Sequence, residues 1–378
     1  MVTDLVVLSL EPWDEVWRRN QHLVAGLLGR DPGLRVLFVE PPVDPLHDVA
    51  TGHRPRRGHG VRPVALSGAE GRLWTFRPTK ILPRRLDPGA DRRLAAATVR
   101  AARRLGFAVP VCWINDPSAA ELLRVTDWPA LYDITDDWLE ADRTPAAHAR
   151  LVRDEALLLA RCAEVVVCSP TLAAAKGAVR PVTLIPNAVD VDLYRRPQPR
   201  PADLPSGPVA VYVGTVHTDR IDLDLCVATA RELGPAGTLV LVGPHPLAAA
   251  DLERLRHAGV LLVGPKPAAE VPGYLQHADV LVVPHVVTPF TLSLDPIKRY
   301  EYAAVGRPVV STPVTGFVEG DPRVTVASGD AFAAAVRTAV PAASAFPAGA
   351  DGPVPSWTER SAEMAEVIER VRRGATPR

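Results

Sequence analysis

The segment Ser293-Leu-Asp-Pro-Ile-Lys-Arg-Tyr-Glu-Tyr-Ala-Ala-Val-Gly-Arg-Pro-Val-Val-Ser-Thr312 decides the fold of the C-terminal half of this chain. Asp295 is a good helix N-cap and Pro296 suits the first helical position, so we expect a helix to begin there. Gly306 suits the position that ends such a helix. The apolar run 308–311 that follows is typical of a buried strand. The segment is therefore a helix–strand unit of an α/β fold.

Short apolar runs recur on both sides of this segment, with amphipathic stretches between them. Most are continuously apolar, as in strands that are buried on both faces of a parallel sheet. Alternation of this kind indicates open parallel α/β sheets. We expect strands at 4–10, 35–40, 109–114, 130–134, 164–168 and 182–185, then at 209–214, 238–242, 260–263, 280–283, 308–311 and 324–327, and helices at 17–29, 91–105, 146–162 and 357–373.

A proline-rich stretch separates the two series of strands. Residues 195–208 are polar and contain five prolines, so they can hardly continue a helix or a central strand. We expect Rossmann-like domains at 1–194 and 209–340, with 195–208 as a linker. Residues 341–378 are expected to form a loose segment and a final helix that packs back on the N-terminal domain. Two such domains imply a ligand cleft at the carboxyl ends of their strands.

The composition excludes several classes of protein. With 47% hydrophobic and 23% charged residues, the chain is globular rather than disordered. No stretch approaches the roughly 18 to 20 apolar residues of a membrane helix, and the N-terminus lacks the features of a signal peptide, so we expect a cytoplasmic protein. A formal net charge of zero disfavours nucleic acid as a partner. The four cysteines have no metal-site spacing and are expected to be reduced core thiols.

Positive charge is concentrated between His53 and Arg104, which contain thirteen Arg and one Lys against three acidic residues. Such a run usually lies on a solvated face. The alternative is a patch that faces an anionic membrane or a phosphorylated acceptor, which would make the protein membrane-associated.

Two places in the C-terminal half combine features that suit a phosphate group. Lys298 falls in the first turn of the expected helix, where the helix dipole prefers an anion, so a bound diphosphate would explain a cation there. Glu301 shares its face and could reach ribose hydroxyls. The alternative is an ordinary i,i+3 ion pair between these two side chains. Gly214 ends the strand that opens this half, and Arg220 follows before a helix whose N-terminus could also meet a phosphate.

The motif Asp295-Pro-Ile-Lys298-x-x-Glu301, with Gly306 and Pro308 after it, resembles the donor-site signature of the large retaining glycosyltransferase family with the GT-B fold, the fourth in the usual numbering. Ile185-Pro-Asn-Ala-Val-Asp190 is similar to a motif that precedes the linker in that family. The N-terminal motifs resemble a bacterial branch that includes teichuronic-acid-type transferases; they are 17–23, 38–42 and 132–137.

The resemblance implies a transferase that moves a sugar from a nucleotide-diphosphate donor, with retention of configuration. The N-terminal domain would bind a glycan, lipid-linked or small-molecule acceptor, and the C-terminal domain would bind the donor. Lys298 and Arg220 would be catalytic, because they supply positive charge at the leaving diphosphate. No metal and no cofactor are expected. The donor-binding residues would be Gly214, Thr215, Ser293, Leu294, Asp295, Lys298 and Glu301.

The sequence departs from the family pattern at two points. The family often has a second glutamate eight positions before Glu301, and here Ser293 stands in that position, so the contact with the donor sugar must differ. The glycine-rich loop after the first strand is replaced by Glu11-Pro-Trp-Asp-Glu-Val-Trp17. An inverting enzyme would need a general base in the first half. The acceptor-side candidates are Asp14, Trp17, His22, Asp116 and Asp136, of which Asp116 has the simpler role of capping a helix before Pro117.

Three other functions compete with this interpretation. A nucleotide-sugar 2-epimerase of the same fold would need paired acid and base groups around the sugar C2, and the sequence offers no convincing pair. A non-catalytic donor-binding subunit of a partner enzyme is favoured by Ser293 and disfavoured by the Lys298/Glu301 pair. A dinucleotide oxidoreductase is least favoured, because neither half has Gly-x-Gly-x-x-Gly after its first strand.

Overall fold

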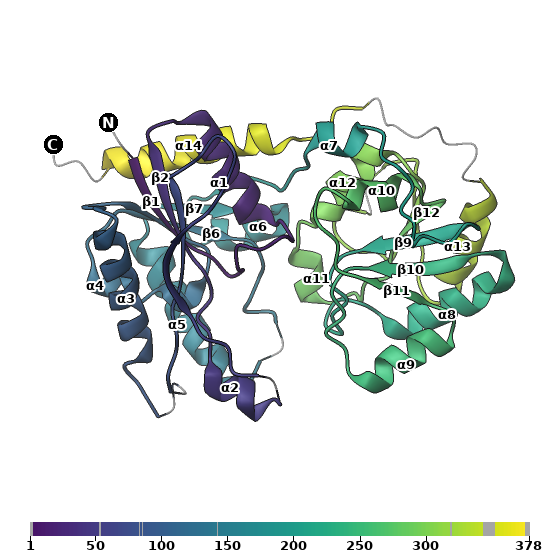
Figure 1. Ribbon diagram of the computed structural model, residues 1–378, viewed down its shortest axis with the longest axis horizontal. Coiled ribbons are helices and arrows are strands. Elements are labelled where there is room, and N and C mark those ends of the chain that lie inside the picture. The colour runs from purple at the N-terminus through teal and green to yellow at the C-terminus, as the bar shows by residue number, and fades with distance from the viewer. Residues whose placement is uncertain are drawn as a thin grey trace. The chain divides into compact units, whose positions relative to one another are not determined.

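The structure, a computed structural model, describes residues 3–52, 54–82, 84, 86–141, 143–317, 320–342 and 352–374. It divides into two compact units. The first unit comprises residues 1–186 and 358–378, and the second comprises residues 187–357. Each unit is an α/β sheet with helices on both faces (Figure 1).

The first unit contains an eight-stranded sheet in the order β3-β4-β2-β1-β5-β6-β7-β8, in which only the edge pair β3–β4 is antiparallel. Its central strands are mostly apolar and buried, as parallel strands covered on both faces require. The strands are β1 Thr3–Leu8, β2 Leu34–Val39, β3 His59–Pro63, β4 Leu73–Arg77, β5 Val111–Ile114, β6 Ala130–Ile134, β7 Glu164–Val167 and β8 Thr183–Leu184.

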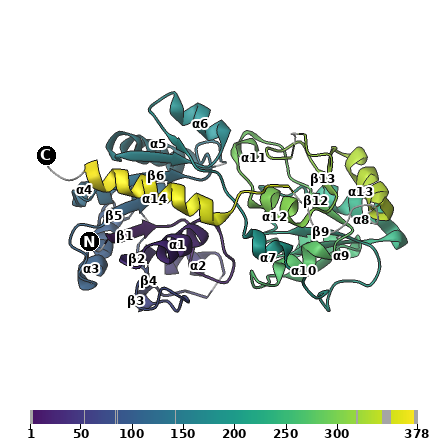
Figure 2. The same cartoon turned by 90° about the horizontal axis from the view of Figure 1, so that it is seen from above.

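The helices of the first unit follow the strands and return the chain to the amino edge of the sheet. They are α1 Arg19–Arg30, α2 Pro45–Ala50, α3 Ala90–Arg104, α4 Leu122–Val125, α5 Pro145–Arg161, α6 Pro170–Gly177 and the C-terminal α14 Trp357–Gly374. α14 runs close to α1 in both views of the chain (Figures 1 and 2). Arg370 on α14 forms an ion pair of 3.1 Å with Glu164 at the start of β7.

The second unit contains a six-stranded, all-parallel sheet in the order β11-β10-β9-β12-β13-β14. Counted from its own first strand this order is 3-2-1-4-5-6, that of the dinucleotide-binding fold. The strands are β9 Val209–Val213, β10 Thr238–Val242, β11 Leu261–Gly264, β12 Val280–Val283, β13 Val309–Ser311 and β14 Val324–Val326.

Helices cover both faces of this second sheet. Figure 1 shows α8, α9 and α13 on one face and α10 and α12 on the other. The helices are α7 Val191–Arg195, α8 Leu223–Leu233, α9 Ala249–His257, α10 Val271–Gln276, α11 Pro289–Ser293, α12 Ile297–Val305 and α13 Asp330–Ala342. The expected fold class, two Rossmann-like parallel-sheet α/β units, is therefore confirmed.

Three details differ from the sequence-based expectations. The strands β3 and β4 within the basic stretch were not predicted, because their residues are interrupted by Arg, Gly and Pro rather than continuously apolar. The second unit begins at residue 187, so the predicted linker 195–208 is part of it. Leu204 of this segment is 5% exposed and belongs to the core of the unit. The predicted loose segment 341–355 lies largely outside the described residues.

No helix among the described residues is long and apolar enough to span a bilayer.

Candidate functional site

Three neighbouring strands of the second unit end at glycines. Gly214, Gly243 and Gly264 terminate β9, β10 and β11, with φ of 145°, 138° and 81°. A Cβ atom on Gly243 would collide with the carbonyl group of Gly214. The N–H of Gly243 donates to the carbonyl of Gly264 at 2.8 Å. The carboxyl edge of this sheet is therefore bare backbone, which a ligand can approach closely.

Lys298 in the first turn of α12 lies against this edge. A Cβ atom on Gly214 would be 2.6 Å from its Nζ atom, and the ammonium is 5.0 Å from the centre of the Tyr212 ring. Within the described part of the chain Lys298 forms no ion pair and no hydrogen bond. The i,i+3 ion pair with Glu301, the simpler alternative from sequence, is absent among the described residues. A half-buried cation is thus held against backbone at the end of the first strand.

Glu301 is held by a tyrosine that the sequence interpretation did not include. The hydroxyl of Tyr194, on α7, donates to Oε1 of Glu301 at 2.6 Å. Burial raises the pKa of Glu301, although this hydrogen bond and the charge of Lys298 oppose that shift. The only sequence signal for Tyr194 was its position just after the Ile185–Asp190 motif.

Arg220 adds a second positive charge to the same place. Its guanidinium lies 5.3 Å from the centre of the Phe290 ring on α11. Burial, followed by the charges of Lys298 and Arg220, lowers the pKa of His285 to about 3. His285, which follows β12, is therefore neutral near pH 7, and its ring lies 5.9 Å from that of Tyr212. The field at this edge of the sheet is positive.

Asp295 has a structural role that differs from the expected one. The helix starts one residue later than predicted, with Pro296 at the N-cap and no side-chain cap. Oδ2 of Asp295 instead accepts the backbone N–H of Asn187 at 2.5 Å, and Oδ1 accepts the hydroxyl of Tyr300 at 2.9 Å. The carboxylate is 8% exposed. It therefore joins the Ile185–Asp190 motif to the donor-site motif. Gly306 ends the helix in the left-handed conformation, as predicted.

The remaining donor-side residues lie close to these groups in the sequence. Ser293 is 2% exposed, and its hydroxyl donates to the carbonyl of Phe290 at 2.7 Å. Leu294 is buried, and Thr215 is half-buried directly after Gly214. The N-terminus of α8, expected to meet a phosphate, is capped by the carboxylate of Asp222, which accepts the N–H of Leu225 at 2.9 Å. That helix end therefore already has an anion, the carboxylate of Asp222.

In the first unit, the acceptor-side candidates follow the carboxyl ends of three adjacent strands. Asp14 and Trp17 lie between β1 and α1, His22 lies in α1, Asp116 follows β5 and Asp136 follows β6. The structure thus places all five at one edge of the sheet.

Several of these five side chains have local structural roles. Asp116 caps a short 3₁₀ turn, as expected, by accepting the N–H and the hydroxyl of Ser118, both at 2.8 Å, and burial raises its pKa. Burial lowers the pKa of His22 to about 3. Asp136 accepts the hydroxyl of Thr135 at 3.3 Å.

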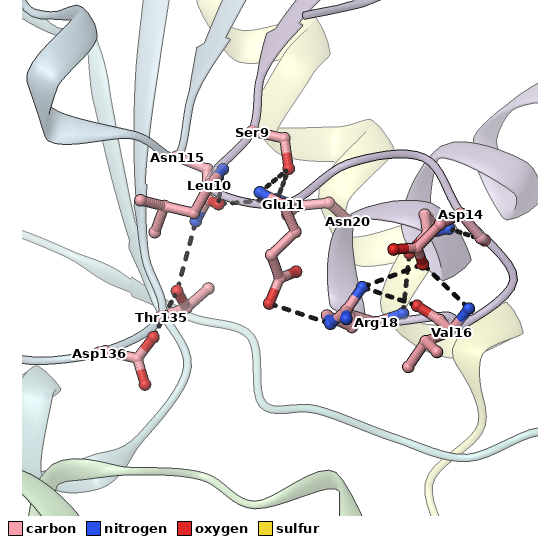
Figure 3. A network of polar contacts seen from close by, with 11 residues as sticks. Ser9, Leu10, Glu11, Asp14, Val16, Arg18, Asn20, Asn115, Thr135 and Asp136 are labelled. Carbon is pink, nitrogen blue, oxygen red and sulfur yellow. Dashed lines mark hydrogen bonds and ion pairs between the residues drawn. The ribbon is translucent and has the colours of Figure 1, made fainter. Parts of the chain in front are cut away.

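A buried polar cluster at this edge was missed by sequence reasoning (Figure 3). The side-chain amide of Asn20 donates to Ser9 at 3.1 Å and to Asn115 at 2.7 Å, and all three residues are at most 3% exposed. Ser9, Asn115 and Glu40 are each the first residue after a buried strand, which is a signal that could have identified them. A cavity of about 40 Å³ adjoins Ser9, Glu40, Asp116 and α3.

Solved structures with the same architecture cover nearly the whole chain. Sucrose-phosphate synthase from Thermosynechococcus elongatus matches with a TM-score of 0.68 at 18% identity, over 99% of this chain and 100% of that one. Anabaena Alr3699/HepE, in complex with UDP and glucose, matches with a TM-score of 0.63 at 15% identity, over 97% and 99% of the two chains. At these identities the likeness concerns the fold. The chain has the GT-B fold of these glycosyltransferases.

More particularly, residues 207–340, which lie in the second unit, match the model of the family described as "Glycosyl transferases group 1". The family resemblance seen in the donor-site motif is thereby confirmed. A curated relative is TuaH of Bacillus subtilis (strain 168), provisionally described as a teichuronic acid biosynthesis glycosyltransferase. It is 24% identical over 219 residues, which are 53% of this chain and 54% of TuaH, so the match spans about half of each protein.

Proposed function

We propose that this protein is a glycosyltransferase that holds a nucleotide-diphosphate sugar at the carboxyl edge of its second sheet and transfers the sugar to an acceptor hydroxyl. The observation that carries the proposal is the ammonium of Lys298, which lies against Gly214 without an ion pair among the described residues. A half-buried cation that forms no direct ion pair is stabilised when a ligand supplies negative charge. Arg220 doubles that charge, and a diphosphate matches it.

The chemistry follows from this charge. Breaking the bond between the anomeric carbon and the diphosphate oxygen leaves its electron pair on the diphosphate. Lys298 and Arg220 stabilise the negative charge that develops there. In the proposed reaction the configuration is retained, as the resemblance implies, and the proton of the acceptor hydroxyl leaves with the diphosphate. Glu301, positioned by Tyr194, accepts hydrogen bonds from ribose hydroxyls.

The experiment combines thermal shift with donor hydrolysis across UDP-, GDP-, dTDP- and ADP-sugars. UDP-sugars come first, because solved relatives are complexes with UDP and with UDP-2-fluoro glucose. Lys298→Met should weaken the binding of the preferred nucleotide by about 10- to 100-fold, the effect of losing a charged hydrogen bond. A matched control is Arg337→Met on α13, whose guanidinium is ion-paired with Glu232 at 2.8 Å. Absence of stabilisation by every nucleotide and nucleotide sugar would refute the proposal.

The same assay separates the competing functions. Donor binding with release of free sugar or transfer supports a transferase. Exchange of deuterium from solvent into the sugar C2 would identify an epimerase instead. Binding without turnover in the presence of every acceptor tried would favour a non-catalytic subunit, for which buried Ser293 is the structural argument.

We also propose that the reaction needs no metal ion, because Lys298 and Arg220 provide the positive charge at the diphosphate. Within the described residues, no group of three His, Cys, Asp or Glu side chains is arranged as a metal site. Hydrolysis of the donor should therefore proceed at the same rate after treatment with EDTA. Loss of activity that Mg²⁺ or Mn²⁺ restores would contradict this part of the proposal.

The acceptor is proposed to be anionic or membrane-proximal. Part of the basic stretch is neutralised, since Arg56, Lys80, Arg84 and Arg93 are paired with nearby aspartates. Of the exposed arginines of α3, Arg93 alone forms an ion pair among the described residues. The other exposed arginines of this helix are Arg92, Arg100, Arg103 and Arg104. Binding to vesicles containing phosphatidylglycerol should fall with salt and in the Arg100→Gln/Arg103→Gln/Arg104→Gln variant. Equal binding to neutral vesicles would contradict it.

A further inference from the structure

Two tryptophans lie together on the loop that replaces the glycine-rich turn of the family. Trp13 and Trp17 are both half-exposed, and their ring centroids are 6.0 Å apart at an interplanar angle of 62°. The ring of Trp13 packs edge-on against that of Phe38 on β2, with 5.1 Å between the ring centroids. The ring of Trp17 packs in the same way against that of His22 on α1, with 5.2 Å between the centroids. The two indoles thus contact a strand and a helix, and neither tryptophan is fully buried.

The loop that carries them is held at several points by side chains. The N–H of Trp13 donates to Oε1 of Glu40 at 2.9 Å, and that of Glu11 donates to Ser9 at 3.0 Å. The side-chain amide of Gln21 donates to the carbonyl of Asp14 at 2.8 Å. These contacts reach β2, β1 and α1. The loop is therefore preorganised, and a ligand that binds the indoles has little ordering cost to overcome.

Charged hydrogen-bonding groups flank the indoles. In Figure 3 Glu11 and Asp14 are both directed toward Arg18, and the guanidinium lies 3.5 Å and 3.2 Å from their carboxylates. Asp14 and the neighbouring Glu15 are exposed. A sugar ring has an apolar face of C–H groups, which packs on an indole, and a rim of hydroxyls, which carboxylates and guanidinium groups bind. A prenyl chain would instead have to desolvate these charges without pairing them.

We propose that residues 11–18 form a saccharide subsite in which a sugar ring of the acceptor packs on Trp13 and Trp17 and hydrogen-bonds to Asp14, Glu11 and Arg18. This inference rests on the proposed glycosyltransferase function and specifies its acceptor as a carbohydrate. It assigns the aromatic loop to acceptor recognition, while the donor is held by the second unit. The two tryptophans act as binding groups and take no part in bond breaking.

The test is a saccharide titration of the full chain, followed by saturation-transfer difference NMR. The probes are methyl α-glucopyranoside, N-acetylglucosamine, glucuronic acid and cellobiose, with farnesyl phosphate as the apolar probe. At least one saccharide should bind, and Trp17→Leu should weaken it about tenfold, while Trp17→Phe keeps most of the affinity. The control is Trp128→Leu. Trp128 is also half-buried, but it precedes β6 and so lies at the amino edge of the same sheet.

The outcomes separate this inference from the proposed function. The control Trp128→Leu should keep the binding of UDP-glucose and its hydrolysis by water, and thermal unfolding of Trp17→Leu verifies that this variant is folded. If donors bind and hydrolyse but no saccharide binds, or if one binds equally to Trp17→Leu, the subsite is wrong and the function stands. Binding of farnesyl phosphate alone would also overturn the subsite. If no donor binds to the wild type, the proposed function itself fails.

Discussion

The substitution Gly214→Ala tests whether the end of β9 is the phosphate-binding edge. The added methyl group would lie 2.6 Å from Nζ and 2.7 Å from Cε of Lys298, and 3.1 Å from the hydroxyl of Tyr212. Since the ammonium ends a flexible side chain, it can move away at small cost to stability. It would then no longer lie against the strand end, and the methyl group would occupy the place where, in the proposed complex, a diphosphate oxygen would meet the backbone.

The effect on stability comes mainly from the backbone. At a φ of 145°, alanine is strained by about 1–2 kcal/mol, which for a unit of this size lowers Tm by roughly 2–8 °C. Gly259→Ala is the matched control, because φ is 88° there and no atom lies within 4 Å of the added Cβ. Gly243→Ala should be more destabilising than either, because its Cβ would meet backbone of Gly214, which cannot yield as a side chain can.

The measurement is thermal unfolding with and without the preferred nucleotide, together with a nucleotide titration. Gly214→Ala and Gly259→Ala should have similar Tm values without ligand. Gly214→Ala alone should lose nucleotide affinity, by about tenfold or more, as expected for a displaced charged contact. If Gly214→Ala keeps wild-type affinity, Lys298 at the end of β9 does not hold the diphosphate, and the reasoning fails.

Three further predictions concern the same unit. Asp295→Asn should lower the free energy of unfolding by about 1–3 kcal/mol, because a buried acceptor of two hydrogen bonds is weakened, and chemical denaturation would measure it. Burial raises the pKa of Glu301 above its ordinary 4.5, so the folded state keeps the carboxyl proton to a higher pH than the unfolded state. Wild type should therefore lose stability relative to Glu301→Gln as the pH rises from about 4.5. A difference in the free energy of unfolding that does not change with pH would contradict this prediction. The pKa of His285 is lowered to about 3, so between pH 6.5 and 3 the imidazole is protonated in the unfolded chain but not in the folded one. Wild type should therefore lose stability relative to His285→Asn as the pH falls through this range, by at most about 1.4 kcal/mol per pH unit. An imidazole of His285 that titrates near 6.5 by NMR would disprove this prediction.

The fold was largely predictable, because buried parallel strands leave continuous apolar runs in the sequence. Every strand of the second sheet was found within about a residue at each end. The edge pair β3 and β4 was not found, since an exposed antiparallel edge needs no such run: Arg62 and Pro63 are both exposed. The break between the units was expected at the prolines, but the chain enters the second unit earlier, where Asp295 binds Asn187.

The candidate site was only partly predictable. Helical spacing put Lys298 and Glu301 on one face and suggested that they pair. In the structure they form no ion pair: Glu301 accepts a hydrogen bond from Tyr194, and Lys298 packs against Gly214. Such long-range contacts join residues about 80 to 110 positions apart and leave no local periodicity. The positions of Ser9 and Asn115 just after buried strands were visible in the sequence, but the hydrogen bonds that join both residues to Asn20 were not.

The first unit is built from both ends of the chain, since α14 belongs with residues 1–186 while the second unit is continuous. Met364, Val367 and Val371 on α14 are at most 1% exposed. During translation, the second unit can therefore fold as soon as it leaves the ribosome, whereas the first must wait for the last helix to be synthesised. A nascent chain stalled near residue 357 would present the uncovered surface of the first unit to chaperones and proteases. For separate expression of the units, residues 187–357 are a suitable fragment, whereas residues 1–186 alone would be prone to aggregate.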